Sequence, residues 1–135
     1  MMVADTDVLI DHLADKAPMA ARVARLIGLG ALHTTAVNRF ELLSGTRSDR
    51  QRDLAETLLA SLPTLPLDEV AADKAAAIRR DLELRGQTIG MGDSLIAGIV
   101  LANGGMLLTR NRGHFERVEG LVLASTSGAA DVETV

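Results

Sequence analysis

Three acidic side chains, far apart in the sequence, adjoin short apolar segments. Asp5 follows an apolar run, Glu41 has apolar neighbours on both sides, and Asp93 opens an apolar segment. Carboxylates that converge in one cleft repel one another, so either some are protonated, with raised pKa values, or a cation lies among them. Oxygen ligands with no cysteine or paired histidine nearby suit a hard ion, Mg²⁺ or Mn²⁺, and such an ion can assist phosphodiester hydrolysis.

Each acid also has a structural interpretation. Asp5 could cap the helix that follows it, and Asp93 stands where a carboxylate stabilises the positive end of a helix dipole. Glu41 alone would be a solvated helix residue. Its apolar neighbours, however, predict partial burial, and a partly buried carboxylate needs a cation or a hydrogen-bond donor. The residues leave both interpretations open.

The elements that would position these acids alternate between strand and helix. Apolar strands are predicted at 2–4, 31–35, 106–108 and 121–123, and the proline-containing segment 62–67 is an extended connector or an edge strand. Helices are predicted at about 8–13, 18–27, 36–45, 48–60, 68–86 and 93–103, with a helical turn near residue 115. Together with the absence of a hairpin signal, this order predicts an α/β fold. We expect three α/β/α layers with a short, mostly parallel sheet.

In an open parallel sheet, ligands bind at the carboxyl ends of the strands. Asp5 follows the first predicted strand, and Thr109, Arg110 and Asn111 follow the strand at 106–108. Glu41 lies near the start of the helix after the second strand, and Asp93 opens the helix at 93–103. We therefore expect the three carboxylates and the polar residues after 106–108 to meet at one edge of the sheet. Residues 1–125 are predicted to form one domain, and residues 126–135 a flexible C-terminal tail.

The composition limits the classes of partner. The 135 residues include no cysteine, so disulfides, cysteine-type zinc sites and thiol nucleophiles are excluded. Two Phe, without Tyr or Trp, offer little for base stacking, and a net charge of −4 argues against a broad basic surface for nucleic acid. The chain shows no signal peptide and no apolar run long enough to span a membrane, so we expect a cytoplasmic protein.

Four segments resemble the conserved blocks of PIN domains, and of VapC-type toxins in particular. They are VADTDVLI at 3–10, TAVNRFELLSG at 35–45, GDSLIA at 92–97 and LTRNRGHFERVEGL at 108–121. The four blocks occur in the expected order and span nearly the whole chain. The resemblance implies that residues 1–125 are a PIN-like nuclease domain.

The resemblance implies a function. PIN domains are Mg²⁺- or Mn²⁺-dependent ribonucleases, and VapC-like members are the toxins of type II toxin–antitoxin pairs. Asp5, Glu41 and Asp93 fall on the metal-binding acids of the family. Expected partners are an RNA substrate, a cognate antitoxin that wraps the toxin and blocks its site, and a second copy of the chain in a homodimer.

The chain departs from the family pattern at the fourth acid. Where many members carry a further acid, this chain has Asn111 and His114, so a one-metal site, or a second ion recruited with the substrate, is expected. Asp7 stands where Asn or Ser is usual, and it either adds negative charge or caps the first helix; the cap is the interpretation favoured here. We expect Asn111 and Thr109 to position a water or the metal ligands.

Arg110 and Arg112 are candidates for phosphate contacts, because a guanidinium binds phosphate oxygens with two parallel hydrogen bonds. Their alternative role is a solvated, charged loop. Helical spacing also places Val37 and Phe40 among the apolar residues of the helix at 36–45. In the helix at 48–60, the same spacing gives an apolar stripe of Leu54, Leu58 and Leu62. This stripe packs in the core or forms a dimer or antitoxin surface.

Two other functions fit parts of the sequence. The Asp5-Thr6-Asp7 segment also resembles the Asp-x-Asp motif of haloacid-dehalogenase-type phosphatases, in which the first Asp is a nucleophile. Those enzymes need a lysine at the site, whereas Lys16 and Lys74 are not placed at a strand end. A chain without its fourth acid could also be a catalytically inactive PIN-like binding module.

Overall fold

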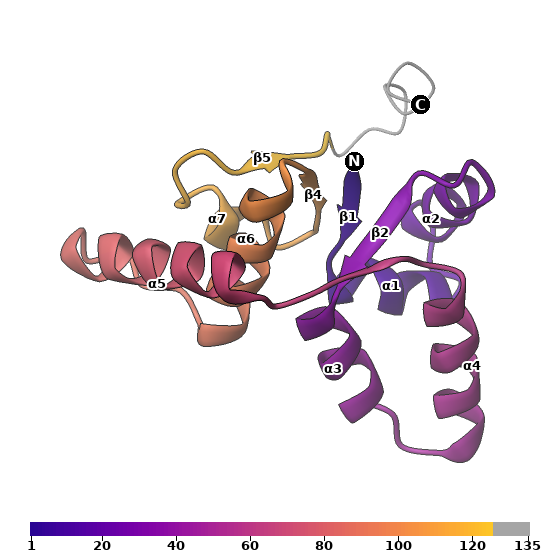
Figure 1. Cartoon of the computed structure of the whole chain (residues 1–135). Coiled ribbons are helices and arrows are strands. Elements are labelled where there is room, and N and C mark those ends of the chain that lie inside the picture. Colours follow the sequence, from indigo (N-terminus) through magenta and orange to yellow (C-terminus); the bar gives the residue numbers. More distant parts are fainter. Residues whose placement is uncertain (126–135) are drawn as a thin grey trace.

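The strands form one parallel sheet at the centre of the molecule (Figure 1). The computed structural model describes residues 1–125. The sheet order is β3-β2-β1-β4-β5, and all four neighbouring pairs are parallel. The strands are β1 (Met2–Ala4), β2 (Leu32–Thr35), β3 (Thr64–Leu65), β4 (Met106–Leu108) and β5 (Val122–Leu123). The predicted parallel sheet is confirmed, and the proline-containing segment forms its edge strand β3.

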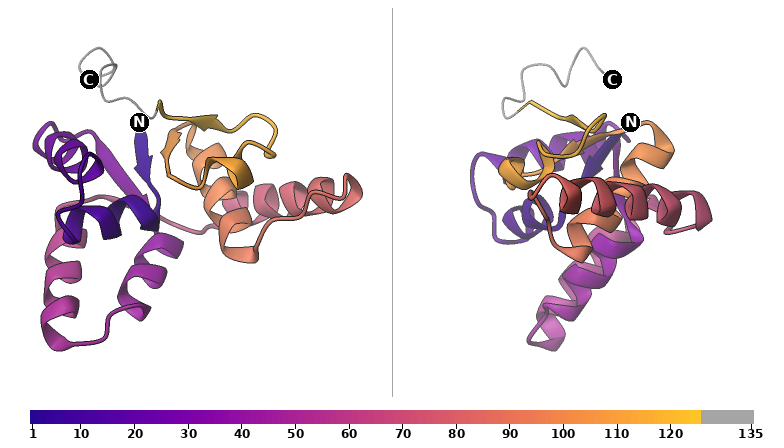
Figure 2. Two further views of the ribbon diagram at one scale, coloured as in Figure 1. Left: turned by 180° about the vertical axis from the view of Figure 1, so that it is seen from behind. Right: turned by 90° about the vertical axis from the view of Figure 1, so that its left-hand side faces the viewer.

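Helices cover both faces of this sheet, which confirms the three-layer α/β/α fold (Figures 1 and 2). They are α1 (Thr6–Leu13), α2 (Met19–Gly28), α3 (Ala36–Ser44), α4 (Asp49–Ala60), α5 (Glu69–Leu84), α6 (Met91–Asn103) and α7 (Arg112–Phe115). Helices α3 and α4 extend together away from the sheet in every view (Figure 2). Within residues 1–125, no helix is long and apolar enough to cross a membrane.

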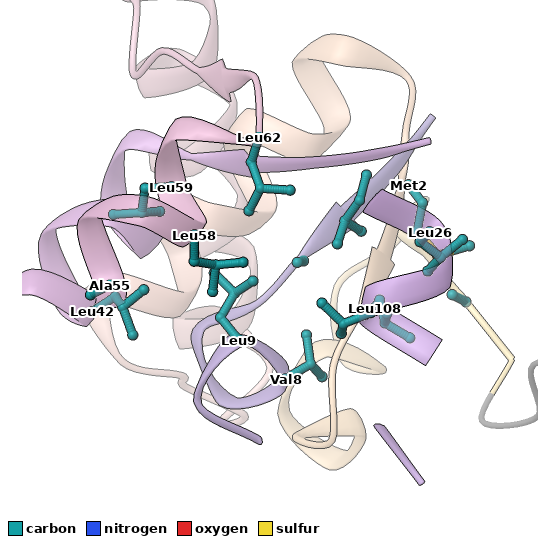
Figure 3. Close-up of a cluster of buried hydrophobic side chains, with 14 residues drawn as sticks. Met2, Val8, Leu9, Leu26, Leu42, Ala55, Leu58, Leu59, Leu62 and Leu108 are labelled. Atoms are coloured by element: carbon teal, nitrogen blue, oxygen red, sulfur yellow. The ribbon is translucent and has the colours of Figure 1, made fainter. Parts of the chain in front are cut away.

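Successive residues of a strand point to opposite faces, so the sheet separates two apolar cores. Met2 and Ala4 face the first core, together with Leu26 and helices α1, α2 and α4 (Figure 3). Val3 faces the second core, which Leu107 shares with helices α5 and α6. The alternation of strand side chains therefore fixes which helices lie on which side of the sheet.

Local sequence signals explain where the helices begin and end. Ser48 and Asp68 cap α4 and α5, because each side chain accepts a hydrogen bond from a backbone N–H in the first turn. Gly104 ends α6 in the left-handed conformation, with φ 68°. Gly98 lets α6 approach α5 closely, since a Cβ there would lie 2.6 Å from the Ala71 carbonyl oxygen.

Two of the apolar residues singled out above are exposed. Phe40 is 68% exposed, and Leu54, at 46%, is not a core residue, so the dimer or antitoxin contact is the alternative that remains for it; Leu58 and Leu62 are buried, as core packing predicts. In α3, the face that packs inward carries Asn38 and Leu42, so Phe40 points to solvent. Helix α6 also begins two residues before the predicted position 93, and the predicted flexible tail at 126–135 lies outside the described residues.

Candidate functional site

Asp5 is the centre of a buried hydrogen-bond network at the carboxyl end of β1. The residue is 6% exposed, and its Oδ1 accepts hydrogen bonds from the Thr6 backbone N–H at 2.9 Å and from Asn38 Nδ2 at 2.9 Å. Its Oδ2 accepts a hydrogen bond from Thr109 Oγ1 at 2.7 Å. Asp5 thus caps α1, as one interpretation allowed, and at the same time joins α1, α3 and the segment after β4.

Burial makes the charge of Asp5 costly. Desolvation is the main cause that raises the pKa of Asp5 to about 6, and the nearby charges of Asp7 and Asp93 raise it further. The hydrogen bonds from Thr109 and Thr6 act in the opposite direction. Without a cation, Asp5 is therefore mostly protonated below about pH 6.

Glu41 is linked to Asp5 through the Thr6 hydroxyl group and the Asn38 amide. Thr6 Oγ1 donates a hydrogen bond to Glu41 Oε1 at 2.6 Å, and Asn38 Nδ2 donates to the same hydroxyl at 2.9 Å. The other oxygen, Glu41 Oε2, would be 3.1 Å from a Cβ at Gly92. Glu41 is half-buried, as predicted, and it contacts the segment that carries Asp93.

Asp93 does not cap its helix. Gly90 is the N-cap of α6 and makes no side-chain cap, and Asp93 lies within the first turn. Its Oδ2 is instead 3.3 Å from Asn111 Nδ2 and 3.3 Å from His114 Nδ1. The structure thus brings Asp93 and Asn111 together, and it adds a histidine to the same cluster.

Asn38 is a site residue that the sequence analysis missed. Its side chain is fully buried, and Thr35 Oγ1 donates a hydrogen bond to its Oδ1 at 2.7 Å. That contact orients the amide so that Nδ2 donates to both Asp5 and Thr6. A signal existed, because residues three apart share one face of a helix and Asn38 precedes Glu41 by three.

Asp7 holds the segment after β4 rather than serving as the cap of α1, a role that belongs to Asp5. Its Oδ2 accepts a hydrogen bond from the Arg110 backbone N–H at 2.9 Å and lies 3.4 Å from Thr109 Oγ1. Its Oδ1 is buried and has no hydrogen-bond partner among the described residues. Burial raises the pKa of Asp7, although the contacts with Arg110 oppose this shift.

The two arginines predicted to contact phosphate are held by other parts of the chain. Arg110 Nε lies 2.7 Å from Asp11 Oδ2, and its Nη2 donates a hydrogen bond to Asp11 Oδ1 at 3.3 Å. Arg112 Nη1 donates a hydrogen bond to the Ala124 carbonyl oxygen at 2.6 Å. The phosphate-binding role of both side chains stays a prediction.

The donor set at this edge fits a hard divalent cation. Within residues 1–125, no three His, Asp or Glu side chains form a ready-made cage for a metal. Mg²⁺ does not need such a cage, because it usually keeps several waters and binds one or two carboxylates. Buried Asp5, with its raised pKa, and the unpartnered Oδ1 of Asp7 both indicate a site that is short of positive charge.

Comparison with known sequences gives matches along almost the whole chain. The family model described as PIN domain matches residues 2–121. The chain is 35% identical over 123 residues to ribonuclease VapC10 of Mycobacterium tuberculosis, with 90% of each chain covered. It is 31% identical over 121 residues to the tRNA(fMet)-specific endonuclease VapC of Shigella flexneri, with 87% of this chain and 91% of the relative covered.

Comparison with solved structures agrees with these matches. DNA-bound VapBC from Salmonella typhimurium contains a chain that superposes with a TM-score of 0.82 at 25% identity, covering 91% of this chain and 96% of that one. VapBC2 from Rickettsia felis, bound to a promoter DNA fragment, gives a TM-score of 0.80 at 17% identity, with 93% and 98% covered. The second likeness, at this identity, is one of fold alone.

Proposed function

Because the chain belongs to the PIN-domain family and is a ribonuclease of the VapC type, we propose that Asp5, Glu41 and Asp93 form the site at which it hydrolyses RNA. The observation that carries this proposal is the network around Asp5. Three segments far apart in the sequence meet there through hydrogen bonds from Thr6, Asn38 and Thr109. A buried acid held by so many donors is oriented for a ligand that the protein itself does not supply.

Asp5 and Asp93 bind the cation directly in this proposal, and Glu41 binds it or holds one of its waters. When bound, Mg²⁺ or Mn²⁺ supplies charge that polarises the scissile phosphate and lowers the pKa of a water molecule. Asn38 and Thr109 fix the two oxygens of Asp5, so that the carboxylate does not rotate. Which of the two ions is used belongs to the proposal, as does the role of Asn111 beside Asp93.

Arg110 and Arg112 are the proposed contacts to the RNA backbone. Arg110 is half-exposed, and Asp11 engages its Nε and Nη2, so Nη1 stays available for a phosphate oxygen. Arg112 is held by its hydrogen bond to the Ala124 carbonyl oxygen, directly after β5, and this contact limits how far the side chain can extend toward RNA. Because the site itself is acidic, cleavage should depend strongly on the cation and on ionic strength.

An antitoxin is the partner expected for a VapC-type protein, and a groove beside the site suits one. The groove has a volume of about 340 Å³, lies between α1, α3 and α4, and is lined by Ile10, Leu13, Leu42 and Leu54, with Glu41 at its polar side. An antitoxin segment that presents apolar side chains and one cation to Glu41 would fill it and block the site. This occupant would account for the exposure of Leu54. The homodimer stays a prediction.

Cleavage of RNA tests the proposed site. The wild-type protein should cleave in the presence of Mg²⁺ or Mn²⁺ and stop when EDTA is added, whereas Asp5→Asn and Asp93→Asn should not cleave. Asp49→Asn, which removes the same charge from a fully exposed position on α4, is the matched control and should cleave normally. Expression of the wild type, but not of Asp93→Asn, should arrest growth.

Two outcomes would reject the site. Equal cleavage by Asp5→Asn and the wild type would remove Asp5 from the chemistry, and absence of cleavage by the wild type would favour an inactive binding module. The phosphatase alternative finds no support, because Lys16 lies beyond the C-terminal end of α1 and Lys74 lies on α5 beside Ile78. A phosphorylated Asp5 trapped with substrate would revive it.

A further inference from the structure

Three side-chain atoms converge on one point next to the acids. They are Asp93 Oδ2 at the start of α6, the Asn111 Nδ2 position after β4, and His114 Nδ1 in α7. The separations are 3.3 Å from Asp93 to Asn111, 3.0 Å from Asn111 to His114, and 3.3 Å from His114 to Asp93. Each of the three atoms is therefore within hydrogen-bond distance of the other two.

Three hydrogen bonds cannot form at once between a carboxylate, an amide and a neutral imidazole in this triangle. Each atom then acts either as donor or as acceptor, so one of the three contacts joins two donors or two acceptors. If Asn111 donates to His114 Nδ1, that nitrogen is an acceptor, and its contact with Asp93 Oδ2 joins two acceptors. If His114 Nδ1 carries the proton instead, its contact with the Asn111 amide nitrogen joins two donors. Turning the amide places its oxygen against the Asp93 carboxylate, so for a carboxylate one contact of this kind remains in either orientation of the amide.

A shared cation removes the conflict. With the Asn111 amide turned, all three atoms carry lone pairs, and all three can point at one positive ion. An octahedral ion with ligands at 2.0–2.1 Å holds neighbouring ligand atoms about 3 Å apart, which is the spacing of this triangle. Asp93, Asn111 and His114 therefore have the geometry of three neighbouring ligands of one ion.

We propose that His114 is a nitrogen ligand of the catalytic cation, together with Asp93 and Asn111, and that it gives the site a preference for Mn²⁺ over Mg²⁺. This inference rests on the function proposed above. Carboxylate, carbonyl and water ligands suit both ions. A nitrogen ligand favours Mn²⁺, because Mg²⁺ is the harder ion and takes oxygen ligands.

The position of His114 suits this role. Its side chain is 48% exposed and that of Asp93 is 23% exposed, so the ring can adjust while the carboxylate is fixed by its helix. The other two histidines lie elsewhere: His12 Nδ1 contacts the Ala20 carbonyl oxygen, and His33 lies in β2 and lines a cavity with Met2. They serve as internal references in a test for nitrogen coordination.

Pulsed electron paramagnetic resonance of the Mn²⁺-loaded protein tests the ligand directly. The Mn²⁺ signal of the wild type should carry the ¹⁴N modulation of a coordinated imidazole, and His114→Gln should lose it while the affinity for Mn²⁺ falls about 10- to 100-fold. His114→Asp should also lose the modulation, but it should bind Mg²⁺ more tightly than the wild type. His12→Gln, the matched control, should behave like the wild type.

The outcomes separate this inference from the proposed function. Mn²⁺ binding that requires Asp93 but shows no imidazole modulation would overturn the role of His114 and leave the metal-dependent nuclease intact. Modulation that persists in His114→Gln would overturn it as well. Failure of the wild type to bind either ion would contradict the proposed function, and the inference would fall with it.

Discussion

The two ends of the parallel sheet differ in what they bury. At the carboxyl end, β1 is followed by Asp5, β2 ends on Thr35, and β4 is followed by Thr109, all of them buried polar residues. At the amino end, the same strands begin with Met2, Leu32 and Met106. These apolar residues belong to the first core or pack against it.

The amino end of the sheet therefore contributes stability, whereas the carboxyl end holds the residues of the proposed site. Apolar side chains at the amino end stabilise the fold by burial, which is worth roughly 25 cal/mol for each Å² removed from water. At the carboxyl end, burial raises the pKa values of Asp5 and Asp7, so their charged forms cost stability until a cation arrives. A functional site is commonly maintained at such a cost to the fold.

Leu32→Ala should give the largest effect on stability, because it damages the amino end. The side chain is 2% exposed in the first core, and its removal should lower the free energy of unfolding by about 2–5 kcal/mol. Urea denaturation measures the change, and metal affinity of the folded protein should stay normal. A loss below about 1 kcal/mol would show that the amino end does not carry the stability.

Asp5→Asn, at the carboxyl end, should instead raise the free energy of unfolding of the metal-free protein. The folded pKa of Asp5, raised from 3.8 to about 6, means that wild-type stability falls as the pH rises from about 4 to about 6. Asn removes this loss, so in the absence of metal the variant should be more stable by up to about 3 kcal/mol above pH 6 and nearly equal at pH 4.

Thermal unfolding at a series of pH values, with chelator and then with Mn²⁺, makes this comparison. Mn²⁺ should stabilise the wild type and leave Asp5→Asn unchanged, because a ligand stabilises only the state that binds it. Asp49→Asn controls for the loss of a negative charge. A variant that is less stable than the wild type at pH 8 without metal would contradict the cost assigned to Asp5.

The sequence predicted more of the fold than of the site. Short apolar runs and helix caps such as Asp68 are local signals, and they placed the strands and most helix ends within two residues. The contacts of Asp7 with Arg110 and of Asp93 with His114 join residues that are distant in the chain, and no local pattern encodes them. The exposure of Phe40 likewise depends on which face of α3 packs inward.

Asn38→Ala should weaken the chemistry without removing a charge. The amide orients Asp5 and Thr6, and loss of such a supporting partner typically lowers metal affinity or activity about 10- to 100-fold. Mn²⁺ titration and RNA cleavage both report the effect. Asn103→Ala, which changes an amide near the C-terminal end of α6, is the matched control, and equal losses in the two variants would argue against a specific role for Asn38.

Asp68→Ala should give the smallest effect and calibrate the others. The side chain caps α5 through a 2.9 Å hydrogen bond from the Ala71 backbone N–H and takes no part in the hydrogen bonds described above for the acids of the site. Loss of a helix cap lowers the free energy of unfolding by about 1 kcal/mol. Chemical denaturation should detect this loss at any pH between 5 and 8, and a change in RNA cleavage would show that α5 influences the site.

Anomalous X-ray scattering from crystals soaked in Mn²⁺ tests the central claim most directly, because it locates the ion among the side chains. We expect a strong peak at the carboxyl end of the sheet, within coordination distance of Asp5 and Asp93 and with Glu41 at or near its ligand shell. A peak that is confined to exposed acids such as Asp49, or no peak at all in crystals soaked in millimolar Mn²⁺, would contradict a cation site built from these acids.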